Sequence, residues 1–213
     1  MNDKRMSEGI EARVLAVSIG ISAPLLIKAA SPPVTVQSGI RKSPVSTVEK
    51  PAEVEVGRLG LAGDEQADLS VHGGLDKAVY MFASEHYPWW QDRQREADAS
   101  SAKRALAFGA LGENLTTVGL VETDLWVGDR LFIGEVEFQV ESPRTPCFKF
   151  NAAMGYSRAV KHMFTSGYTG VYLSVIKTGV ISAGASIDVL PGRREVSILA
   201  ILQRLRGRAQ REA

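Results

Sequence analysis

The chain has 213 residues, of which 45% are hydrophobic and 23% are charged, a composition typical of a globular protein with one sizeable core. Its 25 Lys and Arg side chains nearly balance 24 Asp and Glu side chains, so the net charge of +1 gives no reason to expect a nucleic-acid or membrane partner. The single cysteine excludes a disulfide within the chain and favours a reducing compartment.

The apolar stretch 14–27 resembles the core of a secretory signal peptide, but its context argues against that interpretation. Glu8 and Glu11 precede it among basic residues, and Gly20 and Pro24 interrupt it. No uninterrupted apolar run approaches the roughly 20 residues that a membrane-spanning helix needs. We therefore expect a cytoplasmic protein whose residues 1–12 form a flexible N-terminus.

Strand-type segments dominate the first 80 residues and are separated by Pro-rich and Ser-rich connections. A helix is predicted from Ser84, a suitable N-cap, to about Ala99, because Tyr87 and Trp90 begin a helical spacing. The strands predicted in this half of the chain cover residues 13–19, 34–40, 54–59 and 77–82.

The second half returns to strands, and residues 135–141 give the clearest pattern. Val136, Phe138 and Val140 alternate there with polar residues, which indicates one buried face and one face in water. Gly128-Asp129 is a hairpin-turn signal just before these strands. Further strands are predicted at 124–127, 130–133, 170–176 and 185–190, and further helices at 152–164 and within 194–213.

The tail 194–213 has an apolar helical stripe followed by several arginines. We interpret this basic end as a solvated helix terminus that complements the helix dipole, in preference to a nucleic-acid contact. Many short strands with few helices indicate a mainly β protein, a β-barrel with peripheral helices. We expect one barrel domain over residues 13–192 and a basic C-terminal helix over 193–213.

The only cysteine, Cys147, follows the clearest strand and lies between Arg144 and Lys149. Nearby cations lower the pKa of a thiol from its free value of about 8.5, and thiolates rather than thiols bind metals and attack electrophiles. Pro143 and Pro146 restrict the backbone around the sulfur. The local pattern fits a reactive thiolate and a buried, inert cysteine equally well.

Three further segments contain residues suited to a ligand site. In 71–77, paired glycines let the backbone approach an anion, and His72 and Lys77 add a proton carrier and a cation. In 108–116, Glu113 follows a flexible glycine and could hydrogen-bond a ring nitrogen. Both segments also have an ordinary interpretation: 71–77 could be a turn with a surface histidine, and 108–116 could be a structural turn. The third is the cationic pair 41–42 at the end of a strand, which could equally be solvated surface.

Taken together, these motifs resemble the MOSC domain, named after the C-terminal domain of molybdenum-cofactor sulfurase, and in particular its stand-alone bacterial YiiM-like branch. The resemblance runs in order from about Val14 to Leu190, and composition and periodicity only agree with it. The matching segments are 61–68, 71–74, 76–80, 85–87, 112–115, 128–129 and 143–147.

The resemblance implies a closed, mostly antiparallel β-barrel, like the pyruvate-kinase barrel, with helices at its rim. It also implies a molybdenum cofactor (molybdopterin), with Cys147 as metal ligand or as persulfide carrier, because soft thiolate suits this metal. The family is further associated with pyridoxal phosphate. The candidate catalytic residues are Cys147, His72 and Glu113, and the candidate cofactor contacts are Lys42, Gly73, Gly74, Lys77, Asn114 and Arg144.

For the YiiM-like branch the resemblance implies reduction of N-hydroxylated compounds such as hydroxylamino-purines and amidoximes. One cysteine cannot hold an iron–sulfur cluster, which usually takes four, so an external electron-donor protein is expected. Two alternatives stay open, a non-catalytic cofactor or sulfur carrier, and a cysteine hydrolase with His72 or His162 as base. The chain also stops after one basic helix, where longer members are expected to continue.

Overall fold

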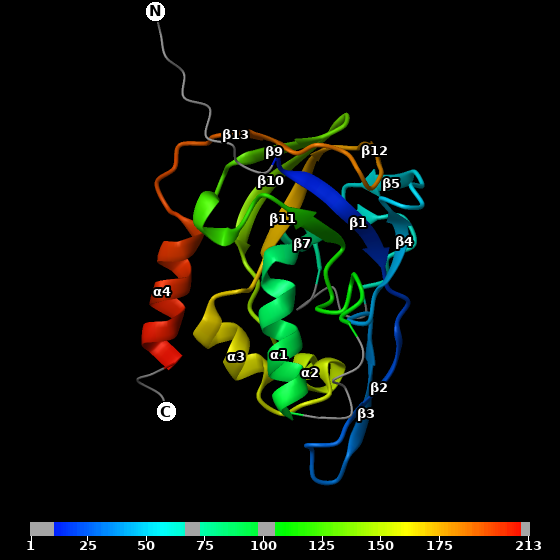
Figure 1. The fold of residues 1–213 in the computed structure, drawn as a ribbon, viewed down its shortest axis with the longest axis vertical. Coiled ribbons are helices and arrows are strands. Elements are labelled where there is room, and N and C mark those ends of the chain that lie inside the picture. The colour runs from blue at the N-terminus through cyan, green and yellow to red at the C-terminus, as the bar shows by residue number, and fades with distance from the viewer. Residues whose placement is uncertain (1–10, 67–72, 98–104, 210–213) are drawn as a thin grey trace, which may run out of the picture.

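The computed structural model describes residues 11–66, 73–97 and 105–209, which form a curled sheet with helices gathered on one side (Figure 1). The predicted catalytic residue His72 and most of the predicted flexible N-terminus lie outside the described residues. No helix in the described ranges is both long and apolar enough to cross a membrane.

The main sheet has eight strands in the order β13-β9-β10-β11-β7-β8-β1-β4. Neighbouring strands are antiparallel except β7 and β8, which pair in parallel. The strands are β1 (Arg13–Ile19), β4 (Ser43–Thr47), β7 (Val79–Ala83), β8 (Leu115–Val118), β9 (Arg130–Ile133), β10 (Val136–Pro143), β11 (Val171–Lys177) and β13 (Asp188–Leu190).

Two small sheets complete the β structure. One has the order β12-β5-β6, and the other is the hairpin of β2 and β3, which extends beyond the helices at the bottom of Figure 1. Their strands are β2 (Ala23–Ile27), β3 (Val34–Ser38), β5 (Val54–Gly57), β6 (Gly60–Leu61) and β12 (Gly179–Ile181).

The barrel is open, so the prediction of a closed barrel is wrong. Strands β13 and β4 form the two edges of the main sheet and do not pair with each other. The segment before β13 meets the backbone of β1 at the isolated bridge between Arg13 and Ser186 and at neighbouring hydrogen bonds, such as Val14 N–H to Ala185 O, without forming a strand ladder. Strand β13 has three residues and is followed by Pro191, which has no N–H to extend a ladder.

Four α-helices and three short 3₁₀ helices accompany the sheets in the described ranges. Strand β7 is buried on both faces, because Val79 and Met81 face one apolar cluster whereas Tyr80 and Phe82 face a second cluster with the helices. The helices are η1 (Leu75–Lys77), η2 (Ser84–His86), α1 (Tyr87–Ala97), η4 (Glu122–Asp124), α2 (Phe148–Met154), α3 (Ala159–Ser166) and α4 (Ile198–Ala209).

Three predicted elements differ from the structure. The single helix predicted at 152–164 is two helices, because Gly155 ends α2 in the left-handed conformation with φ 79°. Residues 122–124 form η4 where a strand was predicted from 124. Ser84 opens the 3₁₀ turn η2 and does not cap α1, which begins at Tyr87.

Candidate functional site

An open pocket with a cavity volume of about 110 Å³ lies where the β3–β4 connection, the ends of β7 and β11, and the segment before α2 meet. Its wall therefore combines parts of the chain that are far apart in sequence. The lining residues are Ser38, Gly39, Ile40, Lys42, Asp64, Glu65, Gln66, Gly73, Lys77, Tyr80, Gly112, Asn114, Arg144, Thr145, Cys147, Lys149 and Tyr172.

Cys147 lines this pocket. Cys147 is partly exposed, has extended backbone, and precedes α2, where its carbonyl accepts a hydrogen bond from the Phe150 N–H at 2.9 Å. Among the described residues, the pocket lining holds four cationic side chains and two carboxylates, so this part of the lining carries an excess of positive charge. A positive pocket with a partly exposed thiol suits an anionic ligand that carries a soft metal or an electrophile.

Lys42 is fixed in the pocket wall by a buried ion pair with Asp64. Burial lowers the pKa of Lys42 and the Asp64 charge raises it, and the net direction is downward. Asp64 also accepts the Gly20 N–H at 2.8 Å and the Asn114 amide N–H at 2.9 Å. The Asn114 side-chain oxygen, Oδ1, in turn accepts a hydrogen bond from the Tyr80 N–H at 3.1 Å. These two predicted cofactor contacts therefore also hold the pocket together.

Arg144 is buried, with 7% of its surface exposed, and its guanidinium lies between the rings of Tyr80 and Phe150 at 4.6 and 4.7 Å from their centroids. It donates to the carbonyl of Leu111. Burial lowers the pKa of Arg144, but the nearby Tyr80 and Tyr172 raise it, and the net direction is upward. No carboxylate in the described part of the chain forms an ion pair with it. A buried cation without a carboxylate favours an anionic ligand at this wall.

Glu113 is fully buried and is absent from the pocket lining, so the structure does not place it against a ligand. Its carboxylate accepts the N–H groups of Gly109 at 2.9 Å and Leu111 at 3.0 Å. The hydroxyls of Thr116, at 3.0 Å, and Tyr87 also donate to it. Burial raises the pKa of Glu113 more than these hydrogen bonds lower it. Glu113 therefore shapes the turn behind the pocket.

That turn needs a glycine where it meets the pocket. Gly112 has φ +89°, and a Cβ there would lie 3.1 Å from the Ile40 side chain and carbonyl. Of the glycines predicted as cofactor contacts, Gly73 lines the pocket and Gly74 does not. Lys77 lines it as well, and its ammonium lies 6.0 Å from the centroid of the Tyr172 ring.

No histidine in the described ranges lines the pocket. His86 contacts Glu122 with 2.7 Å between Nε2 and Oε2, and His162 contacts the Tyr156 hydroxyl at 3.3 Å. His162 is therefore not placed to act as a base for Cys147.

Sequence reasoning did not identify Tyr80 and Tyr172 as pocket residues. They face each other across the antiparallel pair of β7 and β11, with ring centroids 5.5 Å apart. Only knowledge of this strand pairing could have brought them together. Asp64 was not among the predicted site residues, yet it holds both Lys42 and Asn114.

Comparison with known proteins supports the same family throughout. The MOSC domain family model matches residues 68–188. Two curated bacterial relatives are 37% identical over 164 residues ("Uncharacterized protein YflK", Bacillus subtilis) and 35% identical over 159 residues ("Protein YiiM", Escherichia coli). The alignments cover 76% and 74% of this chain, and 68% of each relative.

A fungal relative, named "Reductase" in Gibberella moniliformis, is 37% identical over 132 residues, which is 62% of this chain and 22% of that protein. Among solved structures, YiiM from Geobacillus stearothermophilus has a TM-score of 0.68 and 28% identity, covering 92% of this chain and 85% of that chain. On these sequence and structural matches, the chain belongs to the MOSC domain family.

Proposed function

We propose that this MOSC protein binds a molybdenum–pterin cofactor through Cys147 and reduces N-hydroxylated compounds such as hydroxylamino-purines and amidoximes. The observation that carries the proposal is the position of Cys147 in an open, positively charged pocket beside Arg144, a buried cation that has no carboxylate partner in the described ranges. Membership of the MOSC family and the fungal relative named "Reductase" agree with it.

The residues of the pocket fit such a cofactor chemically. A thiolate is a soft ligand that suits molybdenum already bound to sulfur, and Cys147 provides it. The phosphate of the pterin needs cations and backbone donors, for which Lys42, Lys77, Arg144 and Gly73 are the candidates. When bound, the cofactor would supply two-electron redox chemistry.

Reduction of an N-hydroxyl group breaks the N–O bond. The substrate takes up two electrons and two protons, and its oxygen leaves as water. We expect the electrons to come from an external electron-donor protein, because the one cysteine cannot hold an iron–sulfur cluster. The chain's own task is to bind and orient the substrate within the same pocket.

The test uses protein from a host that makes the cofactor. Molybdenum content, pterin fluorescence and turnover of an N-hydroxylated compound with a chemical reductant are measured for the wild type, Cys147→Ser and Cys147→Ala. We expect the wild type to contain metal and turn over, and both variants to lose metal or activity while keeping the urea midpoint of the wild type.

Two outcomes would contradict parts of this proposal. Wild-type behaviour of both cysteine variants would refute Cys147 as the ligand. A wild type that holds molybdenum but reduces nothing would favour the non-catalytic cofactor or sulfur carrier.

A further inference from the structure

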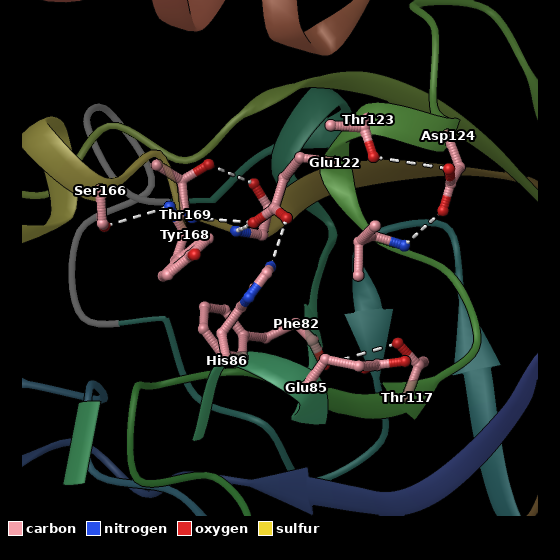
Figure 2. A network of polar contacts seen from close by, with 12 residues as sticks. Phe82, Glu85, His86, Thr117, Glu122, Thr123, Asp124, Ser166, Tyr168 and Thr169 are labelled. Carbon is pink, nitrogen blue, oxygen red and sulfur yellow. Dashed lines mark hydrogen bonds and ion pairs between the residues drawn. The ribbon is translucent and has the colours of Figure 1, made fainter. Parts of the chain in front are cut away.

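A second buried carboxylate, Glu122 in η4, lies in a polar network outside the pocket lining (Figure 2). Its Oε1 accepts the backbone N–H groups of Thr169 at 2.8 Å and Gly170 at 2.7 Å. Its Oε2 lies 2.7 Å from Nε2 of His86, and the His86 ring stacks on Tyr168 with centroids 3.9 Å apart. Glu122 therefore holds the segment that leads into β11.

The same segment supports two residues of the pocket wall. The Tyr80 hydroxyl donates to Thr169 O at 2.7 Å, and the backbone N–H of Arg144 donates to Gly170 O at 3.2 Å. Gly170 has φ +64°, and a Cβ there would lie 2.3 Å from Met81 O, so the segment is packed tightly against β7. A displacement of the Thr169–Gly170 peptide would therefore be passed on to Tyr80 and Arg144.

Glu122 is the partner that these backbone groups need. Buried N–H groups require an acceptor, and hydrogen bonds to an ionised carboxylate are about twice as strong as those to a neutral oxygen. The ion itself is costly to bury unless its other oxygen is also paired, which His86 provides.

Resting on the proposed function, we propose that Glu122, oriented by His86, is a positioning residue for the cofactor pocket. It fixes the Thr169–Gly170 peptide and, through it, the backbone of Arg144 and the ring of Tyr80. Neither Glu122 nor His86 lines the pocket, so neither is a catalytic residue. The effect reaches the ligand only through these hydrogen bonds.

The first measurement is amide hydrogen exchange by NMR in the cofactor-free protein. Glu122→Gln keeps the side-chain shape but weakens both backbone hydrogen bonds, so the amides of Thr169, Gly170 and Arg144 should exchange about tenfold faster. Asp124→Asn is the matched control, because Asp124 lies in the same turn and, among the residues that the structure describes, its side chain accepts hydrogen bonds from the local Val121 N–H and Thr123 hydroxyl alone. It should leave the Arg144 amide unchanged.

The second measurement is cofactor content. Partners of metal ligands outside the coordination shell typically change metal affinity by about 10- to 100-fold when mutated. We expect Glu122→Gln to lower cofactor affinity by about tenfold, whereas turnover per bound molybdenum stays within about twofold. His86→Gln keeps a hydrogen-bond donor for Glu122, whereas His86→Phe keeps only a ring on Tyr168. We therefore expect His86→Gln to retain more of the wild-type cofactor affinity than His86→Phe.

The outcomes separate this inference from the proposed function. Faster exchange at Thr169 and Gly170 with an unchanged Arg144 amide would overturn it, and so would an equal effect of Asp124→Asn. If the amides exchange as expected but the wild type takes up no molybdenum, the proposed function is refuted. The inference that Glu122 positions the pocket wall would then still hold.

Discussion

Two buried glutamates, Glu113 and Glu122, serve similar ends with different partners. Each accepts two backbone N–H groups and so holds one turn beside the pocket. Glu113 adds two neutral hydroxyls, from Tyr87 and Thr116, whereas Glu122 adds the imidazole of His86. Burial raises the pKa of both carboxyls, but the His86 hydrogen bond and charge outweigh it at Glu122 and bring that pKa below its ordinary value.

The difference shows that burial alone does not decide the charge of a carboxyl, since a partner able to carry positive charge reverses the direction. The two turns also converge on one residue. Leu111 O accepts a hydrogen bond from the Arg144 guanidinium, and Gly170 O accepts one from the Arg144 backbone N–H at 3.2 Å. The pocket wall is thus held from one side by Glu113, whose pKa burial raises, and from the other by Glu122, whose pKa is lowered.

The largest expected effect comes from removing the residue on which both turns converge. Arg144→Met keeps the apolar volume between the Tyr80 and Phe150 rings but removes the charge. We expect cofactor affinity to fall by roughly 100-fold, because a buried charge that meets an anion is worth about 2–5 kcal/mol. The stability of the cofactor-free protein should change by no more than about 2 kcal/mol, since Arg144 forms no ion pair with a carboxylate in the described ranges and Met keeps the apolar contacts with the two rings.

Cofactor content and urea unfolding measure these two effects separately. Arg158→Met, at an exposed arginine just before α3, is the matched control and should alter neither. Retention of the cofactor by Arg144→Met would show that the buried guanidinium is purely structural.

The second-largest effect is expected at Glu122, the glutamate whose pKa is lowered. A lowered pKa in the folded state means that Glu122 contributes stability above the pKa of the unfolded chain, and that this is lost as pH falls through the folded value. We expect Glu122→Gln to be less stable than the wild type by about 2–3 kcal/mol at pH 7. In urea unfolding between pH 3 and 7, this gap should narrow below the ordinary carboxyl pKa of about 4.5.

Much of the sheet could be predicted from local pattern. The predicted bounds of β1 and β9 agree with the structure, and the alternation in β10 corresponds to its buried and exposed faces. Local pattern failed where a distant contact decides the outcome. Whether the sheet closes depends on whether its two edge strands pair with each other. The break after Met154 has a different cause: Gly155 ends α2, but a glycine alone does not predict a helix end, because glycine is also found inside continuous helices.

The sequence identified most of the segments that build the pocket, but only part of the geometry of the candidate site. Cys147, Lys42, Arg144 and Asn114 do share one pocket. Glu113 precedes Asn114 in the same motif, yet Glu113 is fully buried while Asn114 lines the pocket, because the turn before β8 directs its own N–H groups onto the Glu113 carboxylate. A motif therefore identifies the segment, and the backbone decides which of its residues meets the ligand.

The smallest effect, and the sharpest test of the comparison, is expected at Glu113. A raised folded pKa means that its contribution is present below the unfolded pKa and is lost as pH rises through the folded value. Glu113→Gln should lower the free energy of unfolding by about 1–2 kcal/mol at pH 4, because the NH₂ group of the introduced glutamine would face the hydrogen-bond donors around it. The difference in free energy of unfolding between the variant and the wild type should become smaller as pH rises. This is the opposite trend to Glu122→Gln, measured by the same urea titrations. If the stability difference between the wild type and Glu113→Gln instead widens with pH, the four donors around Glu113 suffice to keep it ionised. A cationic partner would then not be what distinguishes Glu122 from Glu113.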